Sequence, residues 1–330
     1  MSRKLLILVI IVGLLLPPLA GCSKNPPSQD KQALTPVTVL LDWLPNTNHT
    51  GLYVAKEKDY FKNEGLDVQI MQPGEGGTAQ LVAAGKGDFG ISYQEELTIA
   101  RSQDIPIIAL AAVIQHNTSG FASPVEKEIT SPRDFEGKSY GGWGSPAETA
   151  VIKALMDKYQ ADFSRVEMLN IGEADFFTSM HKGVDFAWIY WGWTGVEAEQ
   201  RNIDLNFIKL QDENPALDFY TPVIITSEKM LKENPELVQK FMRACSKGYQ
   251  FAIENPEEAA ELLLKNEPDL DRSLVMASQK YLVNEYQADA PRWGEMKEEV
   301  WKNYADFMYK NKLIDKNIDP DKAFTNKYLP

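Results

Sequence analysis

One stretch organises this sequence: Asp185-Phe-Ala-Trp-Ile-Tyr-Trp-Gly-Trp-Thr-Gly-Val-Glu-Ala-Glu199. Its first six residues have the composition of a β-strand, and the alternation places Trp188 and Tyr190 on the same face of that strand. Gly192 and Gly195 then mark a turn, so the aromatic residues after Tyr190 are expected near the carboxyl end of a strand. In open α/β sheets, ligands bind at this end. The stretch therefore predicts an α/β fold with an aromatic binding site.

The same stretch also carries two acidic residues, Glu197 and Glu199, at a predicted helix start. A flat aromatic ligand needs π-faces to stack on, and a carboxylate accepts hydrogen bonds from an amino group. The alternative is that the rings belong to the core and the two glutamates form a solvated helix start. Both interpretations remain open at this point.

The beginning of the chain predicts a targeting segment. Arg3 and Lys4 precede an apolar run over 5–16, and Leu19-Ala-Gly-Cys22 has the pattern of a lipoprotein cleavage site. We expect a signal peptide over 1–21, a lipid on the thiol of Cys22 and a polar, proline-containing tether over 22–36. An uncleaved anchor helix is the alternative. The chain is thus expected to be a bacterial lipoprotein on the outer face of the cytoplasmic membrane.

Charge and cysteine content exclude several classes of partner. Removing Arg3 and Lys4 from the 34 Lys and Arg leaves 32, against 47 Asp and Glu, so the mature chain has a net charge of −15. Such an acidic chain disfavours nucleic acid or an anionic membrane surface as a partner. With Cys22 lipidated, Cys245 is left alone and can form no disulfide. No two of the three histidines are spaced as metal ligands, so we expect neither metal nor cofactor.

The order of predicted elements indicates two α/β lobes. Strands and helices alternate from 37 to 114, with one helix predicted over 51–63, and this alternation predicts a parallel sheet; a second unit of this kind extends to 199. Residues 223–226 are expected to rejoin the first sheet, and the chain after Ser227 is predicted to be helical. We assign 37–118 and 220–330 to lobe I and 119–219 to lobe II. Two crossover segments between such lobes allow a cleft to close on a ligand.

Five loops are expected to face this cleft: 42–49, 74–78, 92–96, 141–148 and 190–199. They contain no Lys and no Arg. Their acidic residues are Asp42, Glu75, Glu95, Glu96, Glu148, Glu197 and Glu199, and their large aromatic residues are Trp43, Tyr93, Trp143, Tyr190, Trp191 and Trp193. An oxyanion is usually held by Arg or Lys, although helix N-termini alone can bind one. The loops therefore favour a neutral or amine-bearing aromatic ring.

Two of these loops contain candidate polar contacts. Gly141-Gly-Trp-Gly-Ser-Pro146 predicts a helix start with Ser145 as N-cap and Pro146 at the first helical position. It lacks the pattern of a nucleotide-binding loop, so it either faces the ligand or only caps the helix. His49, which precedes another helix, either contacts the ligand or caps its own turn.

Several of the loop segments resemble a known family. They are Leu41-Asp-Trp-Leu-Pro-Asn-Thr-Asn-His-Thr-Gly-Leu-Tyr53, Gln72-Pro-Gly-Glu75, Gly142-Trp-Gly-Ser-Pro146 and Trp191-Gly-Trp-Thr-Gly-Val-Glu-Ala-Glu199. They look like the NMT1/THI5-like family of ABC-transporter solute-binding proteins, and the similarity covers nearly all of 37–330. The resemblance implies a type II periplasmic-binding-protein fold. It is strongest to lipoproteins that bind formylaminopyrimidine, a thiamine-breakdown product, for delivery to a permease and an ATPase.

The family also contains an enzyme, a pyrimidine synthase that consumes its own histidine and carries a cysteine-rich motif. The corresponding region here is aromatic and has no cysteine, and the chain is predicted to be exported, so the resemblance speaks against an enzyme. The alternatives are a binder of another flat heterocycle, such as a riboflavin-type precursor, a binder of an alkylsulfonate, a pyrimidine synthase-like enzyme, or a purely structural lipoprotein.

We therefore expect two lobes that close on an aminopyrimidine for thiamine pyrimidine salvage. The predicted ligand-binding residues all lie in the cleft loops, and they are Trp43, Asn46, His49, Tyr93, Gly144, Ser145, Tyr190, Trp191 and Glu197. The rings of Trp43, Tyr93, Tyr190 and Trp191 are predicted to stack on the ligand. Glu197 is predicted to accept its amine, so that Glu197→Ala would cost about 1.5–3 kcal/mol of binding free energy.

Overall fold

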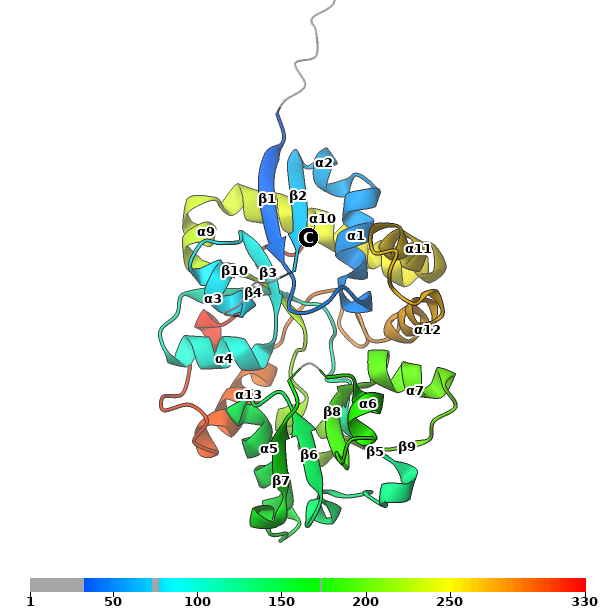
Figure 1. Ribbon diagram of the computed structural model, residues 1–330. Coiled ribbons are helices and arrows are strands. Elements are labelled where there is room, and N and C mark those ends of the chain that lie inside the picture. The colour runs from blue at the N-terminus through cyan, green and yellow to red at the C-terminus, as the bar shows by residue number, and fades with distance from the viewer. Residues whose placement is uncertain (1–32, 73–76, 173) are drawn as a thin grey trace, which may run out of the picture. The chain divides into compact units, whose positions relative to one another are not determined.

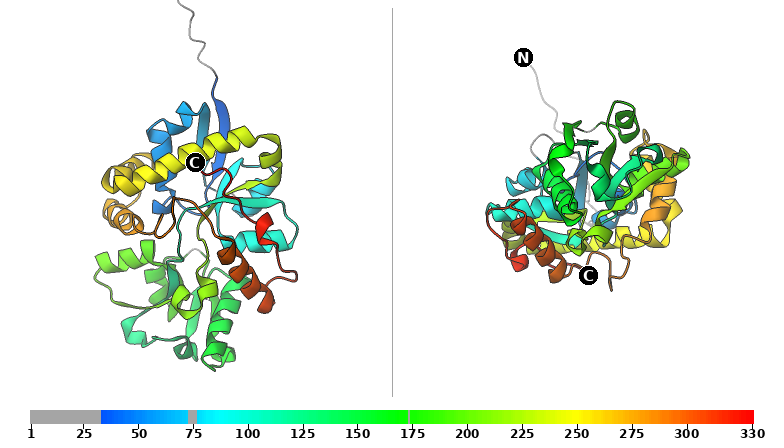
Figure 2. Two further views of the ribbon diagram at one scale, coloured as in Figure 1. Left: turned by 180° about the vertical axis from the view of Figure 1, so that it is seen from behind. Right: turned by 90° about the horizontal axis from the view of Figure 1, so that it is seen from below.

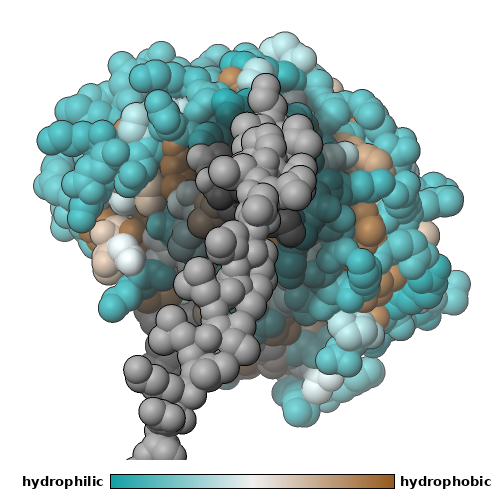
Figure 3. Space-filling view, turned by 90° about the horizontal axis from the view of Figure 1, so that it is seen from above, coloured by the Kyte–Doolittle hydropathy of each residue, from teal (hydrophilic) through white to brown (hydrophobic). Residues whose placement is uncertain are grey.

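The computed structural model describes residues 33–72, 77–172 and 174–330. The predicted signal peptide, Cys22 with its predicted lipid, the predicted tether up to residue 32, and Glu75 lie outside the described residues. Within the described ranges, no helix combines the length and the apolar character needed to cross a membrane. Seen from the end at which the first strand begins, the surface is mostly hydrophilic, with scattered apolar patches (Figure 3).

The first sheet has five strands in the order β2-β1-β3-β10-β4 (Figure 1). These strands are β1 (Thr35–Leu40), β2 (Leu66–Met71), β3 (Phe89–Ser92), β4 (Ile107–Ala112) and β10 (Val223–Ser227). Strand β1 pairs in parallel with β2 and β3, as predicted, whereas β10 lies antiparallel between β3 and β4. The predicted return of 223–226 to this sheet is confirmed. Strand β10 runs against its neighbours because it enters from the end at which they finish.

Helices cover both faces of this sheet. They are α1 (Thr50–Glu57), α2 (Tyr60–Asn63), α3 (Thr78–Ala83), α4 (Gln94–Ser102), α9 (Glu228–Glu233) and α10 (Pro235–Glu254). Two more helices pack outside them: α11 (Pro256–Asn266) lies on α1 and α10, and α12 (Arg272–Leu282) lies on α11. The single helix predicted over 51–63 is wrong, because Asp59 takes a left-handed conformation (φ 56°) and separates α1 from α2. The apolar face of α10 buries Phe241, whose ring stacks on Phe89 with centroids 3.8 Å apart. This contact fixes the longest helix to the sheet.

The second sheet has the order β7-β6-β8-β5-β9. Its strands are β5 (Ser119–Pro124), β6 (Ser139–Gly142), β7 (Glu167–Asn170), β8 (Phe186–Tyr190) and β9 (Leu205–Lys209), and its helices are α5 (Pro146–Lys158), α6 (Phe176–Met180), α7 (Val196–Gln200) and α8 (Leu210–Glu213). Strand β9 was not predicted. Trp188 of β8 is buried, and its ring meets that of Phe121 edge-on at 5.4 Å, so this tryptophan belongs to the core.

Two sets of connections lie between the sheets (Figures 1 and 2). The chain passes from β4 to β5 and returns before β10, in agreement with the two predicted crossover segments. In addition, helix α13 (Glu298–Lys310) packs into both cores, because Trp301 lies in the core beside the first sheet while Tyr304 and Phe307 lie in that beside the second. The residue ranges assigned to the two lobes remain a prediction, and α13 serves both.

Candidate functional site

Polar side chains from both sheets meet where their strands end. We call this group the interlobe cluster, and it consists of Asp42, Tyr93, Glu95, Ser145, Glu148 and Tyr190. A contact of 3.5 Å joins the Ser145 hydroxyl, at the start of α5, to the Glu95 carboxyl group, at the start of α4. Since α4 follows a strand of the first sheet and α5 follows a strand of the second, this contact spans the two lobes.

His49 holds Asp42. The sequence left this histidine with two possible roles, contact with the ligand or capping of its own turn. Nδ1 of His49 accepts the backbone N–H of Asn46 at 3.2 Å, so Nε2 carries the proton and donates to the Asp42 carboxylate at 2.6 Å. Burial acts to raise the pKa of Asp42, but the His49 ring and the Tyr93 hydroxyl outweigh burial and lower it. His49 is fully buried, so its ring positions Asp42 and stays away from the surface of the site.

The two tyrosines of the cluster surround this carboxylate. Burial and the charge of Asp42 raise the pKa of Tyr93 well above its usual value. Burial also raises the pKa of Tyr190, with further contributions from Glu95, Asp42 and Glu148. Both hydroxyl groups therefore stay protonated and can donate hydrogen bonds. Apart from burial, the largest of these influences come from His49 and from acidic or hydroxyl groups.

Glu148 shapes the loop that carries Ser145. Its carboxylate accepts hydrogen bonds from the Tyr140 hydroxyl (2.6 Å) and from the backbone N–H groups of Trp143 (3.1 Å) and Ser145 (2.7 Å). Ser145 caps α5 in return, as predicted, by accepting the N–H of residue 147. Gly144 has a φ of +85°, and a Cβ there would lie 2.6 Å from the amide of Asn170. The loop therefore requires glycine at this position.

Two tryptophans remain accessible beside the cluster. Trp43, which follows Asp42, is 37% exposed, and Trp143, in the loop bound by Glu148, is 43% exposed. The edge of Trp143 meets Trp188 with centroids 5.6 Å apart, which fixes its orientation. These two rings can provide stacking surfaces near the carboxyl groups of the loops that carry them.

Three predicted ligand-binding residues have other partners. The side chain of Asn46 bonds within its own turn, to the Asn48 N–H and the Leu44 carbonyl. The Trp191 ring packs on Phe207 at 4.7 Å in the core of the second lobe. Asn46 and Trp191 therefore each have a partner within the protein.

Glu197, the third, forms an ion pair with Arg201, one helical turn further along α7. Burial raises the pKa of Glu197, and the other charges that act on it come from Arg201, Asp175 and Asp271. None of these belongs to the interlobe cluster. The prediction that Glu197 meets the amine therefore faces a competing cation, while Glu95 has none.

Two residues with unusual environments escaped the sequence analysis as site candidates. Burial, with the nearby charges of Glu148 and Glu96, raises the pKa of Glu95 to about 7. The Tyr304 hydroxyl of α13 is buried without a hydrogen-bond partner, and its pKa is raised by burial and then by Glu95 and Tyr190. Glu95 stood among the acidic residues of the cleft loops. Tyr304 gave no signal, because it lies far along the chain in an ordinary amphipathic helix.

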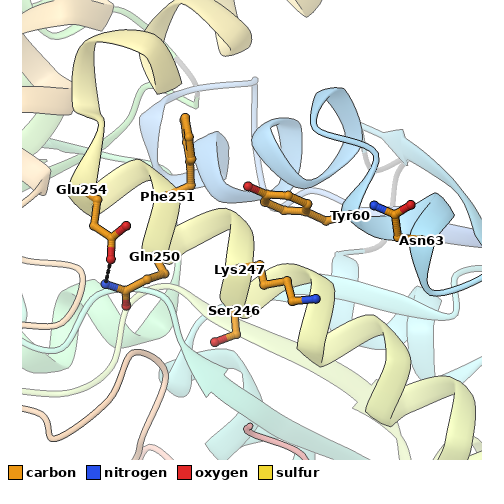
Figure 4. A pocket seen from close by; sticks show the side chains of 7 residues that line it. All are labelled: Tyr60, Asn63, Ser246, Lys247, Gln250, Phe251 and Glu254. Atoms are coloured by element: carbon orange, nitrogen blue, oxygen red, sulfur yellow. Dashed lines mark hydrogen bonds between the residues drawn. The ribbon is translucent and has the colours of Figure 1, made fainter.

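A surface groove of about 520 Å³ lies elsewhere, between α2 and α10 (Figure 4). Its walls include Tyr60, Lys247 and Phe251, and Gln250 bonds Glu254 beside them. None of the predicted site residues lines it. Among the described residues, no group of three His, Cys, Asp or Glu is arranged to hold a metal ion.

The topology and the interlobe site define the class of protein, a type II periplasmic-binding-protein fold with two α/β lobes. Solved structures agree. The alkanesulfonate-binding protein SsuA from Xanthomonas axonopodis pv. citri, bound to MOPS, superimposes with a TM-score of 0.68 at 12% identity, covering 88% of this chain and 98% of that one. At this identity the likeness shows the fold alone.

The chain belongs to the NMT1/THI5-like family, which it matches over residues 46–259. It is 29% identical to the formylaminopyrimidine-binding protein of Halalkalibacterium halodurans, over 93% of this chain and 94% of the relative. It is 25% identical to the riboflavin-binding protein RibY of Chloroflexus aurantiacus, over 100% of this chain and 97% of that protein. Pyrimidine phosphate synthases also occur among its relatives, at 25% identity and below. The two binding-protein relatives support a solute-binding role for this chain, in agreement with the prediction of a binding protein rather than an enzyme.

Proposed function

We propose that this protein is the extracytoplasmic solute-binding lipoprotein of an ABC importer and binds an aminopyrimidine such as formylaminopyrimidine for thiamine pyrimidine salvage. The observation that carries the proposal is the interlobe cluster, in which carboxyl and phenol groups from both lobes lie beside two open tryptophans without a Lys or Arg. The formylaminopyrimidine-binding relative supports the choice of ligand.

The chemistry of the cluster suits a flat, amine-bearing ring. Trp43 and Trp143 offer π-faces, and the hydroxyl groups of Tyr93 and Tyr190 offer donors to ring nitrogens. The carboxyl groups are left to accept hydrogen bonds from an amine. A sulfonate would bring negative charge next to Asp42 and Glu95, and the interlobe cluster contains no Lys or Arg to offset it, so the cluster disfavours the anionic alternative.

A thermal-shift panel tests the ligand class. Formylaminopyrimidine, riboflavin and an alkanesulfonate are each added to the purified protein, and a ligand at 100 times its dissociation constant raises the unfolding free energy by about 2.7 kcal/mol. We expect formylaminopyrimidine to raise the melting temperature and the sulfonate to leave it unchanged. A shift with riboflavin alone would instead support the riboflavin alternative, which the relationship to RibY favours.

A second experiment tests the membrane anchor. Expression in a bacterium with and without Cys22→Ser should show a lipid-modified, membrane-associated protein only for the original chain. An equal distribution of the two proteins between membrane and soluble fractions would contradict the lipoprotein assignment. Co-purification of a permease and an ATPase with the anchored form would support the importer.

A further inference from the structure

Glu95 differs from the other acidic residues of the interlobe cluster in having few partners within the protein. Asp42 is held by His49, and Glu148 accepts three hydrogen bonds from its own lobe. Among the described residues, Glu95 forms one hydrogen bond, the 3.5 Å contact with Ser145, which lies at the outer limit for such a bond. The residue is half-buried, and its carboxyl group retains most of its capacity to accept hydrogen bonds.

A second, independent feature points to the same place. Tyr304 is 1% exposed, and its hydroxyl has no hydrogen-bond partner. Buried polar groups are normally hydrogen-bonded, so an unpaired buried hydroxyl calls for an explanation. The charges that act on this hydroxyl come from Glu95 and Tyr190. A buried donor from α13 and the carboxyl group at the start of α4 therefore lie near each other and near the end of β8.

We propose that Glu95, with the Tyr304 hydroxyl beside it, is the residue that selects the ligand, by pairing its carboxyl group with the exocyclic amine and adjacent ring nitrogen of an aminopyrimidine. This inference rests on the function proposed above. It moves the amine acceptor from Glu197, which Arg201 already occupies, to the opposite lobe. Ser145 then contacts the same carboxyl group from the second lobe, so that lobe closure and amine recognition depend on one residue.

The protonation of Glu95 suits this role. Its pKa of about 7 lets the carboxyl group share one proton with a weakly basic ring nitrogen while it accepts the amine N–H. A ligand with a carbonyl oxygen in place of the amine would set two acceptors against each other. Sites built to bond a polar group strongly reject analogues that leave the buried partner unpaired.

The test compares two ligands and three variants by titration calorimetry. The ligands are formylaminopyrimidine and its 4-oxo analogue, in which oxygen replaces the amine. The variants are Glu95→Gln, Tyr304→Phe and, as the matched control, Glu197→Gln. We expect the original protein to prefer the amine by about 10-fold to 100-fold and Glu95→Gln to lose most of this preference. Tyr304→Phe should weaken binding of the amine by about tenfold or less, and Glu197→Gln should keep the preference.

Each outcome has a defined meaning. Failure of the original protein to bind formylaminopyrimidine would refute the proposed function itself. Binding of both ligands with equal affinity, or full preference for the amine in Glu95→Gln, would overturn only the role of Glu95. Loss of the preference in Glu197→Gln would return that role to Glu197. Circular dichroism shows whether each variant is folded, and Tyr304→Phe tests the same pair if Glu95→Gln does not fold.

Discussion

Replacement of Glu148 by alanine should both destabilise the protein and weaken ligand binding. The side chain is 1% exposed and accepts hydrogen bonds from the Tyr140 hydroxyl and from the backbone N–H groups of Trp143 and Ser145. Hydrogen bonds to a charged group contribute about 1.5–3 kcal/mol each. Water can replace the carboxylate at the open loop, but it cannot readily reach Tyr140, which is also 1% exposed.

We therefore expect the free energy of unfolding to fall by about 3 kcal/mol, which combines one buried unpaired hydroxyl with the loss of a helix cap. With an unfolding entropy of about 0.6 kcal/mol/K for about 300 folded residues, the melting temperature should fall by roughly 5 °C. Affinity for formylaminopyrimidine should fall as well, because the loop that presents Trp143 and Ser145 loses its anchor.

Differential scanning calorimetry measures the first effect and titration calorimetry the second. Glu298→Ala is the matched control, because Glu298 also lies in the first turn of a helix but is exposed, and its effect should stay within about 0.5 kcal/mol. The unfolding free energy of Glu148→Gln should lie nearer to that of Glu148→Ala than to that of the original protein, because the new amide nitrogen would face a hydrogen-bond donor. An unfolding free energy for Glu148→Ala within about 0.5 kcal/mol of the original would refute this account of the loop.

Three further predictions concern stability. Gly248→Ala would place a Cβ 2.0 Å from the Gly51 carbonyl oxygen and should lower the unfolding free energy by about 1–3 kcal/mol or more, measurable by urea denaturation; an unchanged midpoint would contradict the close packing of α1 on α10. His116 bonds two aspartates, first Asp218 (2.7 Å), and its pKa is raised to about 8. Because the folded pKa of His116 exceeds the unfolded value near 6.5, its contribution to the free energy of unfolding is present below pH 6.5 and is lost as the pH rises through 8. His116→Gln should therefore remove the fall in melting temperature over this pH range. The pKa of Glu95 is about 7 in the folded protein against about 4.5 in the unfolded chain, so the free energy of unfolding falls as the pH rises from 4.5 to 7. Glu95→Gln should therefore have a higher melting temperature than the original protein at about pH 8. A lower melting temperature would mean that the fold stabilises the ionised form of Glu95.

Local sequence determined the parts of the fold that depend on neighbouring residues. The alternation in 185–190 predicted β8, and Ser145 with Pro146 predicted the start of α5, because caps and strand periodicity involve only a few adjacent positions. The absence of Lys and Arg from the cleft loops likewise indicated an acidic, aromatic site. Asp59 carried no comparable local signal, and its left-handed conformation divides one predicted helix into two.

Tertiary structure decided which of these residues meet. Glu197 and Glu95 are both acids at helix starts, and the i, i+4 spacing of Glu197 and Arg201 can be read from the sequence. The burial of Glu95 and its nearness to Glu148 and Ser145 of the second lobe could not be read there. Tyr304 reaches the interlobe cluster only because α13 packs into both cores. The free energy of a carboxyl or hydroxyl group depends on burial and on charges that the chain brings together over long distances, and no local pattern records them.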